Sequence, residues 1–223
     1  MKILNLYAGI GGNRKLWTDC EVTAVEYDAE IAKVYQHNHP SDTVIVGDAH
    51  KYLLDHFKEF DFIWASPPCP THSRLRTSHP ESIVYPEMSL YQEIILLTHW
   101  FKGLFCVENV IPYYDSLITP TATIHRHCFW ANFHIKHIDV VPFRACDMIG
   151  ERMYLEERIG LDVNIDAKID KRKVLRNCVL PEVGKAIKDS VVLHHTTNAM
   201  RFAGSPALPN GEQTLDLFAT SPC

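Results

Sequence analysis

The sequence has no apolar run long enough to cross a bilayer, no Cys-x-x-Cys pair and no excess of basic residues. The first absence argues against a membrane-spanning protein, and the polar-interrupted start of the chain is unlike a secretory signal. We therefore expect a cytoplasmic protein with no membrane partner. The seven cysteines are scattered and odd in number, which argues against a disulfide framework or a structural zinc site. No histidine pair has His-x-x-x-His spacing with a carboxylate base, so we expect no metal.

The bulk composition is that of an ordinary globular protein. The 223 residues suffice for one well-buried domain, and 46% of them are hydrophobic. The formal net charge is -5, so binding to nucleic acid would need a local basic patch rather than an overall positive charge.

Short apolar runs alternate with helix-like segments through the first half of the chain. Strand-helix alternation predicts an α/β fold with a mostly parallel sheet and helices on both faces. The expected strands are Ile3–Tyr7, Val22–Glu26, Thr43–Val46, Phe60–Ala65 and Phe105–Glu108. The expected helices are Asp28–Gln36, Ala49–His56 and Ser89–Phe101.

The second half is less regular. We expect two antiparallel strands, 128–133 and 135–141, and two helices, 152–159 and 180–191. Residues 194–223 combine Gly, Ser, Pro, Thr and Asn without periodicity, which predicts a flexible tail.

Polar groups follow the first three expected strands. The turn 6–12 is rich in glycine, which lets the backbone approach a ligand, although a tight strand-to-helix connection explains it equally well. Glu26 ends the second strand, where a carboxylate can accept hydrogen bonds from ribose hydroxyls, while Asp28 caps the next helix. Asp48 follows the third strand, and a helix cap is the favoured interpretation of it.

Two further motifs end the fourth and fifth strands. In Pro67-Pro68-Cys69, the prolines fix the backbone and present the cysteine rigidly at a strand end. A helix terminus or nearby cation would lower the pKa of the thiol and make it a nucleophile. Glu108 should lie near Cys69 at the same edge of the sheet, and an apolar pocket would raise its pKa so that it can donate a proton.

In this order, the motifs resemble those of the DNA cytosine carbon-5 methyltransferases, from Leu4 to about Lys188. The most specific parts are 7–12, Pro67-Pro68-Cys69 and Glu108-Asn109-Val110. Residues 126–133 resemble the family's arginine-bearing motif. Residues 176–181 resemble its last motif, which packs back against the first. The compactness is similar to that of members carried by bacteriophages and mobile elements, which implies the cytoplasm of a bacterial host and a role such as restriction-modification.

The resemblance implies a Rossmann-like, S-adenosylmethionine-dependent fold and a set of site residues. Cys69 would attack carbon 6 of a flipped cytosine, and Glu108 would protonate or hydrogen-bond ring nitrogen 3. Asn109 would support the pocket, and Arg126 would fill the arginine role, although His125 and His127 leave that alignment open. The implied catalytic residues are Cys69, Glu108, Asn109, Pro68 and Arg126. The implied cofactor-binding residues are Tyr7, Ala8, Gly9, Gly11, Gly12, Glu26, Tyr27, Asp48, Ala49, Pro67 and Asn177.

The expected partner is double-stranded DNA. The polar, basic segment 71–79 resembles the family's mobile loop over DNA, in which Ser73, Arg74 and Arg76 would bind the substrate. A second basic cluster, Lys171 to Lys173 with Arg176, is better explained as solvated surface. The expected organisation is a catalytic core (1–141), a minimal target-recognition region (142–172), a segment returning to the core (173–193) and the tail.

Two other functions stay open from the sequence. One branch of the family methylates transfer RNA, but its extension of the Pro-Pro-Cys motif is not evident in Pro70-Thr71-His72-Ser73. A non-catalytic binding or regulatory protein would be expected to lack Cys69 or Glu108. We expect a monomer, with an accessory subunit as the alternative because the region for target recognition is so short.

Overall fold

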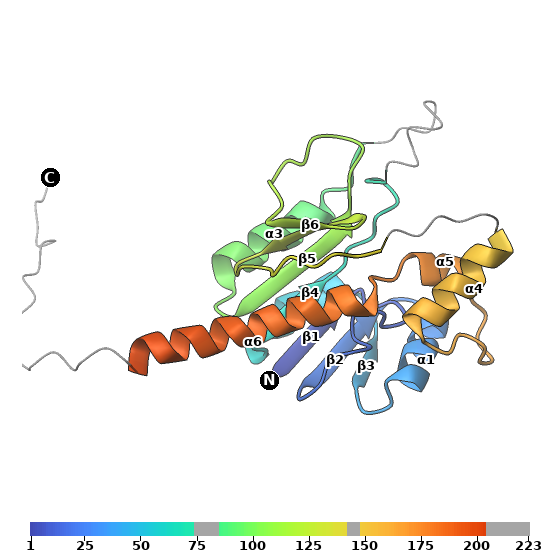
Figure 1. Ribbon diagram of the computed structural model, residues 1–223, viewed down its shortest axis with the longest axis horizontal. Helices are drawn as coiled ribbons and strands as arrows, with labels where there is room; N and C mark the ends of the chain where they lie inside the picture. Colours follow the sequence, from blue (N-terminus) through green and yellow to red (C-terminus); the bar gives the residue numbers. More distant parts are fainter. Residues whose placement is uncertain (74–84, 142–147, 204–223) are drawn as a thin grey trace, which may run out of the picture.

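The computed structural model describes residues 1–73, 85–141 and 148–203, which form one sheet covered by helices (Figure 1). The sheet has seven strands in the order β3-β2-β1-β4-β5-β7-β6. Strands β1 to β5 run parallel, and β7 and β6 are antiparallel additions next to β5. The strands are β1 (Lys2–Leu6), β2 (Glu21–Glu26), β3 (Thr43–Val46), β4 (Phe62–Ala65), β5 (Leu104–Val110), β6 (Ala122–Ile124) and β7 (His127–Ala131).

The helices lie on both faces of the sheet, which confirms the expected α/β class. They are α1 (Ala29–Asn38), α2 (Ala49–His56), the short 3-10 helix η1 (Phe57–Glu59), α3 (Ser89–Trp100), α4 (Met148–Ile159), α5 (Lys171–Arg176) and α6 (Pro181–Ala203).

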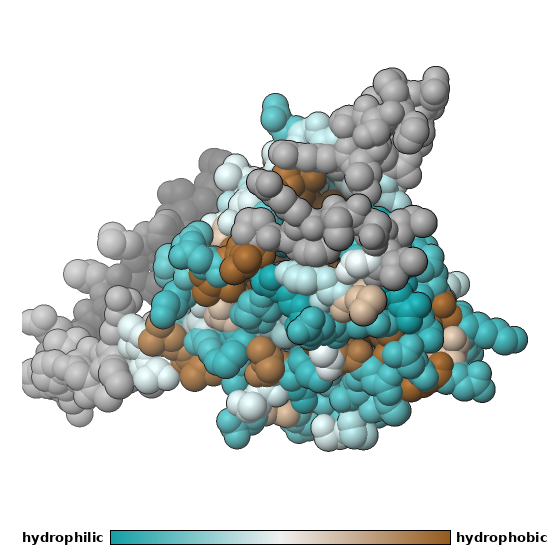
Figure 2. Space-filling model, turned by 45° about the vertical axis from the view of Figure 1, so that its right-hand side comes forward, coloured by the Kyte–Doolittle hydropathy of each residue, from teal (hydrophilic) through white to brown (hydrophobic). Residues whose placement is uncertain are grey.

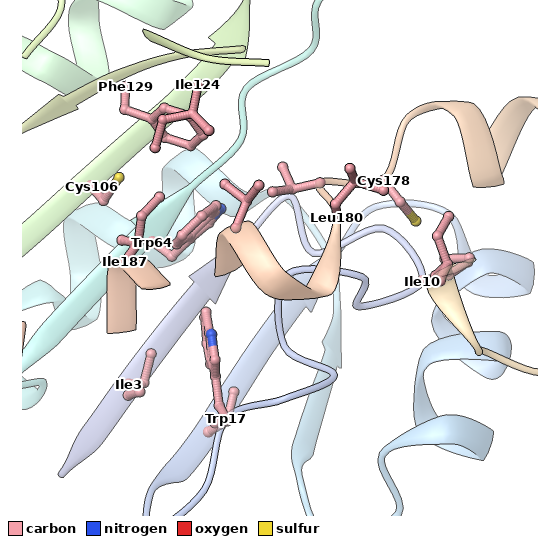
Figure 3. Packing of buried hydrophobic residues seen from close by; sticks show 14 of the residues in the cluster. Ile3, Ile10, Trp17, Trp64, Cys106, Ile124, Phe129, Cys178, Leu180 and Ile187 are labelled. Carbon is pink, nitrogen blue, oxygen red and sulfur yellow. The ribbon is translucent and has the colours of Figure 1, made fainter. Parts of the chain in front are cut away.

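Alternation along the strands divides the core into two layers. On one face, strand side chains such as Ile3, Trp64 and Cys106 pack with α1, α4 and α6, and Figure 3 shows Ile187 of α6 beside Trp64. On the other face, neighbouring strand residues such as Leu4 and Ile63 pack with α2 and α3. The central strands β1, β4 and β5 are buried on both faces, as expected for a parallel sheet, whereas the edge strand β3 is half-buried to exposed.

The predicted elements of the first half match the structure closely. Strand β3 and helix α2 have the predicted bounds, and the other predicted bounds differ by at most two residues. Asp28 caps α1, because its carboxylate accepts hydrogen bonds from the amides of Glu30 at 2.8 Å and Ile31 at 3.3 Å. The cap explains why the helix begins where it does.

The predicted strand 135–141 is wrong. Strand β7 instead pairs with β6, a strand that was not predicted from the sequence. Phe133 and Ile135 are buried in the core layer that contains α6, and the amide of Lys136 donates to Ser190 Oγ at 3.1 Å. This stretch therefore packs on a helix, and its alternating pattern reflects that contact rather than strand pairing.

The predicted tail is also wrong in part, because α6 continues to Ala203 and includes residues 194–203. Residues 204–223 lie outside the described part of the chain. Val183, Ile187 and Val191 bury the first half of α6, whereas its second half projects beyond the sheet (Figure 1). Residues 192–197 of this second half are exposed or half-buried, so they lack the buried apolar periodicity by which a helix is predicted.

Among the described residues, no helix combines the length and apolar character needed to cross a bilayer. In Figure 2, hydrophilic residues dominate the visible face, and hydrophobic residues form small groups between them.

Candidate active site

The ends of β1 and β2 are joined by the carboxylate of Glu26. The amide of Gly9 donates to Oε2 at 2.8 Å, and the amide of Asp28 donates to Oε1 at 3.0 Å. Tyr7 and Gly9 both adopt positive φ, at 55° and 57°. Each carboxylate oxygen has a second lone pair, so Glu26 retains the capacity to accept two hydroxyl groups.

The space beside this edge is open. A Cβ built on Gly9 or on Gly47 would meet no atom within 4 Å, and Tyr27 is 80% exposed. Asp48 caps α2 by accepting from the amide of Lys51 at 3.0 Å, which agrees with the favoured interpretation of this residue. Ala8 and Ala49 are buried at the bases of the two loops.

Gly11 and Gly12 serve close packing. A Cβ on Gly11 would lie 2.5 Å from His39 Nε2, and one on Gly12 would lie 2.7 Å from the carbonyl oxygen of Val179. The segment 176–181 therefore packs back against the glycine loop, as the resemblance implied. Asn177 is exposed at the end of α5, where its backbone amide caps the helix.

The Pro-Pro-Cys motif follows β4 in a compact turn. Asn109 Nδ2 donates to the carbonyl oxygen of Pro67 at 2.9 Å, so the end of β5 fixes this turn. The carbonyl oxygen of Cys69 accepts from the amides of His72 at 3.0 Å and Ser73 at 3.2 Å. Pro68 is exposed, and Cys69 itself is half-buried.

Glu108, at the end of neighbouring β5, is only 6% exposed. Burial raises its pKa to about 7, although a hydrogen bond from Ser66 and the charge of Arg126 oppose the rise. His127 Nδ1 lies 3.6 Å from Glu108 Oε1. Burial, with the charges of Arg126 and His125, lowers the pKa of His127 to about 3, so this imidazole is neutral and the contact is not an ion pair.

The expected direction of the Cys69 pKa is wrong. Cations are present, since Arg126 and Lys173 both act to lower it. Burial of the thiol and the negative charge of Glu108 outweigh them and raise the pKa above the ordinary value of 9.0. The resting group is therefore a thiol, and its ionisation depends on a change beside it.

Among residues 125–127, only Arg126 brings a cation to this cluster. Its Nη2 donates to the carbonyl oxygen of Arg176, which ties the turn between β6 and β7 to α5. Burial and the charge of Arg176 lower its pKa, whereas Glu108 and Cys69 act in the opposite direction. His125 is exposed.

A partly buried chain of hydrogen bonds supports the Cys69 turn and was not predicted from the sequence. The amide of Leu117 donates to Tyr91 Oη at 3.1 Å, and Tyr91 Oη donates to Tyr114 Oη at 3.1 Å. Tyr114 Oη, 2.6 Å from His72 Nδ1, then has its own proton to donate to that nitrogen. His72 is fully buried, so the start of the segment 71–79 is not the mobile surface we expected.

The basic residues divide into three groups. Arg74 and Arg76 lie outside the described residues, and Ser73 is half-buried. In the second cluster, Arg172 Nη2 lies 2.6 Å from Glu151 Oε2, and Arg176 Nε lies 3.6 Å from Glu151 Oε1. Lys173 is exposed and contributes its charge to the surroundings of Cys69.

These features define the class of protein. The fold is the Rossmann-like fold of S-adenosylmethionine-dependent methyltransferases. It combines a parallel sheet extended by antiparallel β7, a glycine loop after β1 and a carboxylate at the end of β2. Both groups of site residues lie at the carboxyl ends of the parallel strands, on either side of the point where the strand order reverses between β1 and β4.

The chain belongs to the C-5 cytosine-specific DNA methylase family, whose model matches residues 1–111. Three solved structures are similar to it over 52% of this chain. DNMT2 from Spodoptera frugiperda, as a triple mutant, is 25% identical over 37% of its own length, with a TM-score of 0.39. The Entamoeba histolytica methyltransferase EhMeth is 17% identical over 40% of its length, with a TM-score of 0.37. A DNA modification methyltransferase encoded within an Escherichia coli prophage is 19% identical over 34% of its length, with a TM-score of 0.35. The chain thus spans well under half the length of each of these proteins.

S-adenosylmethionine is the methyl donor of this family, and the residues at the carboxyl ends of β1, β2 and β3 fit it. The open space beside Gly9 and Gly47 leaves room for a ligand, and Glu26 offers acceptors for hydroxyl groups. In the described part of the chain, no three His, Cys, Asp or Glu side chains cluster in a way that would hold a metal ion.

Proposed function

We propose that this chain transfers a methyl group from S-adenosylmethionine to carbon 5 of cytosine in double-stranded DNA. The observation that carries the proposal is the convergence of a thiol and a buried carboxyl group with pKa about 7 at the ends of neighbouring strands β4 and β5. A cation, Arg126, acts on both groups.

When bound, S-adenosylmethionine supplies an electrophilic methyl group on its sulfonium. We assign the adenine contacts to Tyr7 and Tyr27 and the ribose contacts to Glu26. Asp48 would accept from the adenine amino group, since a carboxylate that caps a helix retains unused lone pairs. The remaining proposed contacts come mainly from the backbones of Ala8, Gly9, Gly11, Gly12, Ala49, Pro67 and Asn177.

The cytosine side uses covalent catalysis. The Cys69 thiolate adds to carbon 6, and electron density reaches carbon 5, which then takes the methyl group. Loss of the proton at carbon 5 to a base and elimination of Cys69 restore the ring. Asn109 and Pro68 hold the turn that presents Cys69, since Asn109 Nδ2 donates to the neighbouring Pro67 carbonyl.

Glu108 supplies the proton or hydrogen bond at ring nitrogen 3, and a pKa of about 7 suits a general acid that works near neutral pH. Its protonation also removes the negative charge that raises the pKa of Cys69. Transfer of the Cys69 proton to Glu108 would therefore prepare the acid for the cytosine and the nucleophile together, with Arg126 stabilising whichever of the two groups is negatively charged.

Methylation of duplex DNA requires the target base to leave the duplex, because carbon 6 is inaccessible within the stack. Ser73, Arg74 and Arg76 are assigned to the substrate strand. Residues 142–172 form the proposed target-recognition region. Because this region is short, we propose a short DNA target, read either by a monomer or together with an accessory subunit.

The test is incubation of the protein with labelled S-adenosylmethionine and unmethylated duplex DNA, followed by identification of product nucleosides by mass. The expected product is 5-methylcytosine, absent with Cys69→Ala. An RNA substrate is tested in parallel. Methylation of RNA alone would overturn the DNA assignment and leave the chemistry in place, and no methylation of either substrate would overturn the proposed activity.

A further inference from the structure

Helix α3 carries a buried carboxylate that none of the steps above uses. Glu93 is 0% exposed and lies among the apolar residues Leu90, Ile94 and Leu97, which pack α3 on the sheet. Burying a carboxylate in such a layer is costly unless the group makes specific contacts. A leucine would pack here at lower cost, so the contacts of Glu93 indicate what it does.

Two donors from different elements converge on one oxygen of Glu93. Tyr7 Oη donates to Oε1 at 2.7 Å, and His50 Nδ1 lies 3.0 Å from the same oxygen. Gln92 Nε2 lies 2.9 Å from His50 Nε2 and donates to it, so the imidazole proton is on Nδ1 and points to Glu93. The second oxygen, Oε2, is buried and has no hydrogen-bond partner among the described residues.

The two donors lie beside the open space at the carboxyl ends of β1 and β3, one in the loop after β1 and one at the start of α2. Tyr7 follows β1 with a φ of 55°, a conformation that costs energy for a residue with a side chain. His50 is in the first turn of α2, directly after Asp48 and Ala49. Without an acceptor at position 93, the hydroxyl of the half-buried Tyr7 would lose its partner, and the link between Tyr7 and the start of α2 would be lost.

We propose that Glu93 is a positioning residue of the cofactor site, which holds the Tyr7 ring and the start of α2 at the spacing that the adenine end of the cofactor needs. The proposal rests on the proposed function, since it takes this edge to be the S-adenosylmethionine site. Glu93 touches neither the cofactor nor the DNA in this role. It acts through Tyr7 and His50.

The same helix supplies a matched control. Tyr91 is also buried, at 2% exposed, and is also hydrogen-bonded, but its partner is Tyr114 on the Cys69 side of the site. Tyr91→Phe thus removes the two hydrogen bonds of the Tyr91 hydroxyl, to Tyr114 and from the Leu117 amide, without touching the cofactor loops. Glu93→Gln is the conservative variant, because its amide oxygen can still accept from both donors while its nitrogen takes the place of the unpaired Oε2.

The experiment measures binding of S-adenosylhomocysteine by calorimetry in the full chain. Loss of hydrogen bonds to a charged group predicts that Glu93→Leu weakens binding by about 10-fold to 100-fold. Glu93→Gln should stay within about threefold of the wild type and Tyr91→Phe within about twofold, since each keeps the Tyr7 and His50 contacts. Hydrogen exchange of residues 7–12 without ligand should accelerate in Glu93→Leu and not in Tyr91→Phe.

If Glu93→Leu fails to fold, Tyr7→Phe tests the same link from the other side, with an expected loss of about threefold to 10-fold. Wild-type affinity in folded Glu93→Leu or in Tyr7→Phe would overturn the proposal and leave the proposed function intact. A wild-type protein that does not bind S-adenosylhomocysteine would overturn both.

Discussion

Glu108→Gln would separate two effects that the wild-type carboxyl group combines. The substituted amide remains neutral at every pH, so it cannot protonate ring nitrogen 3, and it carries no negative charge to raise the pKa of Cys69. We therefore expect the thiol of the variant to ionise more readily while methyl transfer becomes slower. Few single substitutions should make the nucleophile more reactive and the enzyme less active.

The number of protons on Glu108 and Cys69 determines how the population of the reactive form depends on pH. The reactive form has a protonated Glu108 and a Cys69 thiolate, which is the same number of protons as the resting carboxylate and thiol. Because burial raises the pKa of Cys69 whereas Glu108 has a pKa of about 7, the reactive form is the minor one of the two. Between these values the population of the reactive form is constant, so kcat/KM should rise with pH through about 7 and then stay level until Cys69 ionises.

In Glu108→Gln the limb near pH 7 should disappear. Loss of a general acid should reduce the rate of methylation by about 10²-fold to 10⁴-fold, or roughly 3 to 5 kcal/mol in the activation free energy. The pKa of the Cys69 thiol should fall in the variant, because the charge of Glu108 is, after burial, the largest effect that raises it.

Two assays are needed. Iodoacetamide labelling against pH, with Cys69 followed by peptide mass because Cys20 is also half-buried, reports the thiol pKa. Single-turnover methylation of duplex DNA against pH reports the chemistry, and Glu59→Gln, which changes an exposed glutamate, is the control. An unchanged labelling profile in Glu108→Gln, or a wild-type kcat/KM profile with no break near pH 7, would refute the reasoning.

Two further substitutions test the supports of the site. His72→Phe keeps a ring but removes the acceptor of Tyr114 Oη, so methylation should fall by about 10-fold, the value of one buried hydrogen bond, while S-adenosylhomocysteine affinity stays unchanged. A loss of cofactor affinity in that variant would contradict the assignment of His72 to the Cys69 turn. Gly184→Ala would place a Cβ 2.1 Å from the carbonyl oxygen of Asn13, so urea unfolding should show about 1 to 3 kcal/mol of destabilisation. Unchanged stability would mean that the glycine loop and α6 can separate at little cost.

Apolar runs and helix-capping residues in the sequence predicted the parallel core well. Four of the five parallel strands, β1, β2, β4 and β5, are short and largely buried, so they are visible in the sequence as apolar runs. Asp28 and Asp48 begin their helices with the expected caps. Because parallel strands share one carboxyl edge, placing Glu26, Cys69 and Glu108 at strand ends was enough to predict their shared edge. The stretch 135–141 was misassigned, since burial against a helix and burial in a sheet leave similar patterns.

The supporting network could not be predicted because its partners are distant in sequence. Tyr7 and Glu93 are 86 positions apart, and His72 and Tyr114 are 42 apart. A buried glutamate in an apolar helix was a local signal for Glu93, but nothing in the sequence identified its donors. The sign of the Cys69 pKa shift is a similar case. It depends on the balance of burial, Glu108, Arg126 and Lys173, which only their arrangement in space determines.

Several residues in the described part of the proposed target-recognition region anchor it to the core, which limits how this region could read a DNA sequence. Ile159 and Val163 are buried in the layer of α6. Asp162 lies 3.1 Å from His37 Nε2 of α1 and accepts from Asn38 Nδ2 at its carbonyl oxygen at 2.8 Å. Side chains and backbone used in this way cannot also reach base edges in a groove, and direct readout requires such reach. The packing therefore supports the proposed short target or accessory subunit over an extended recognition surface within residues 148–172.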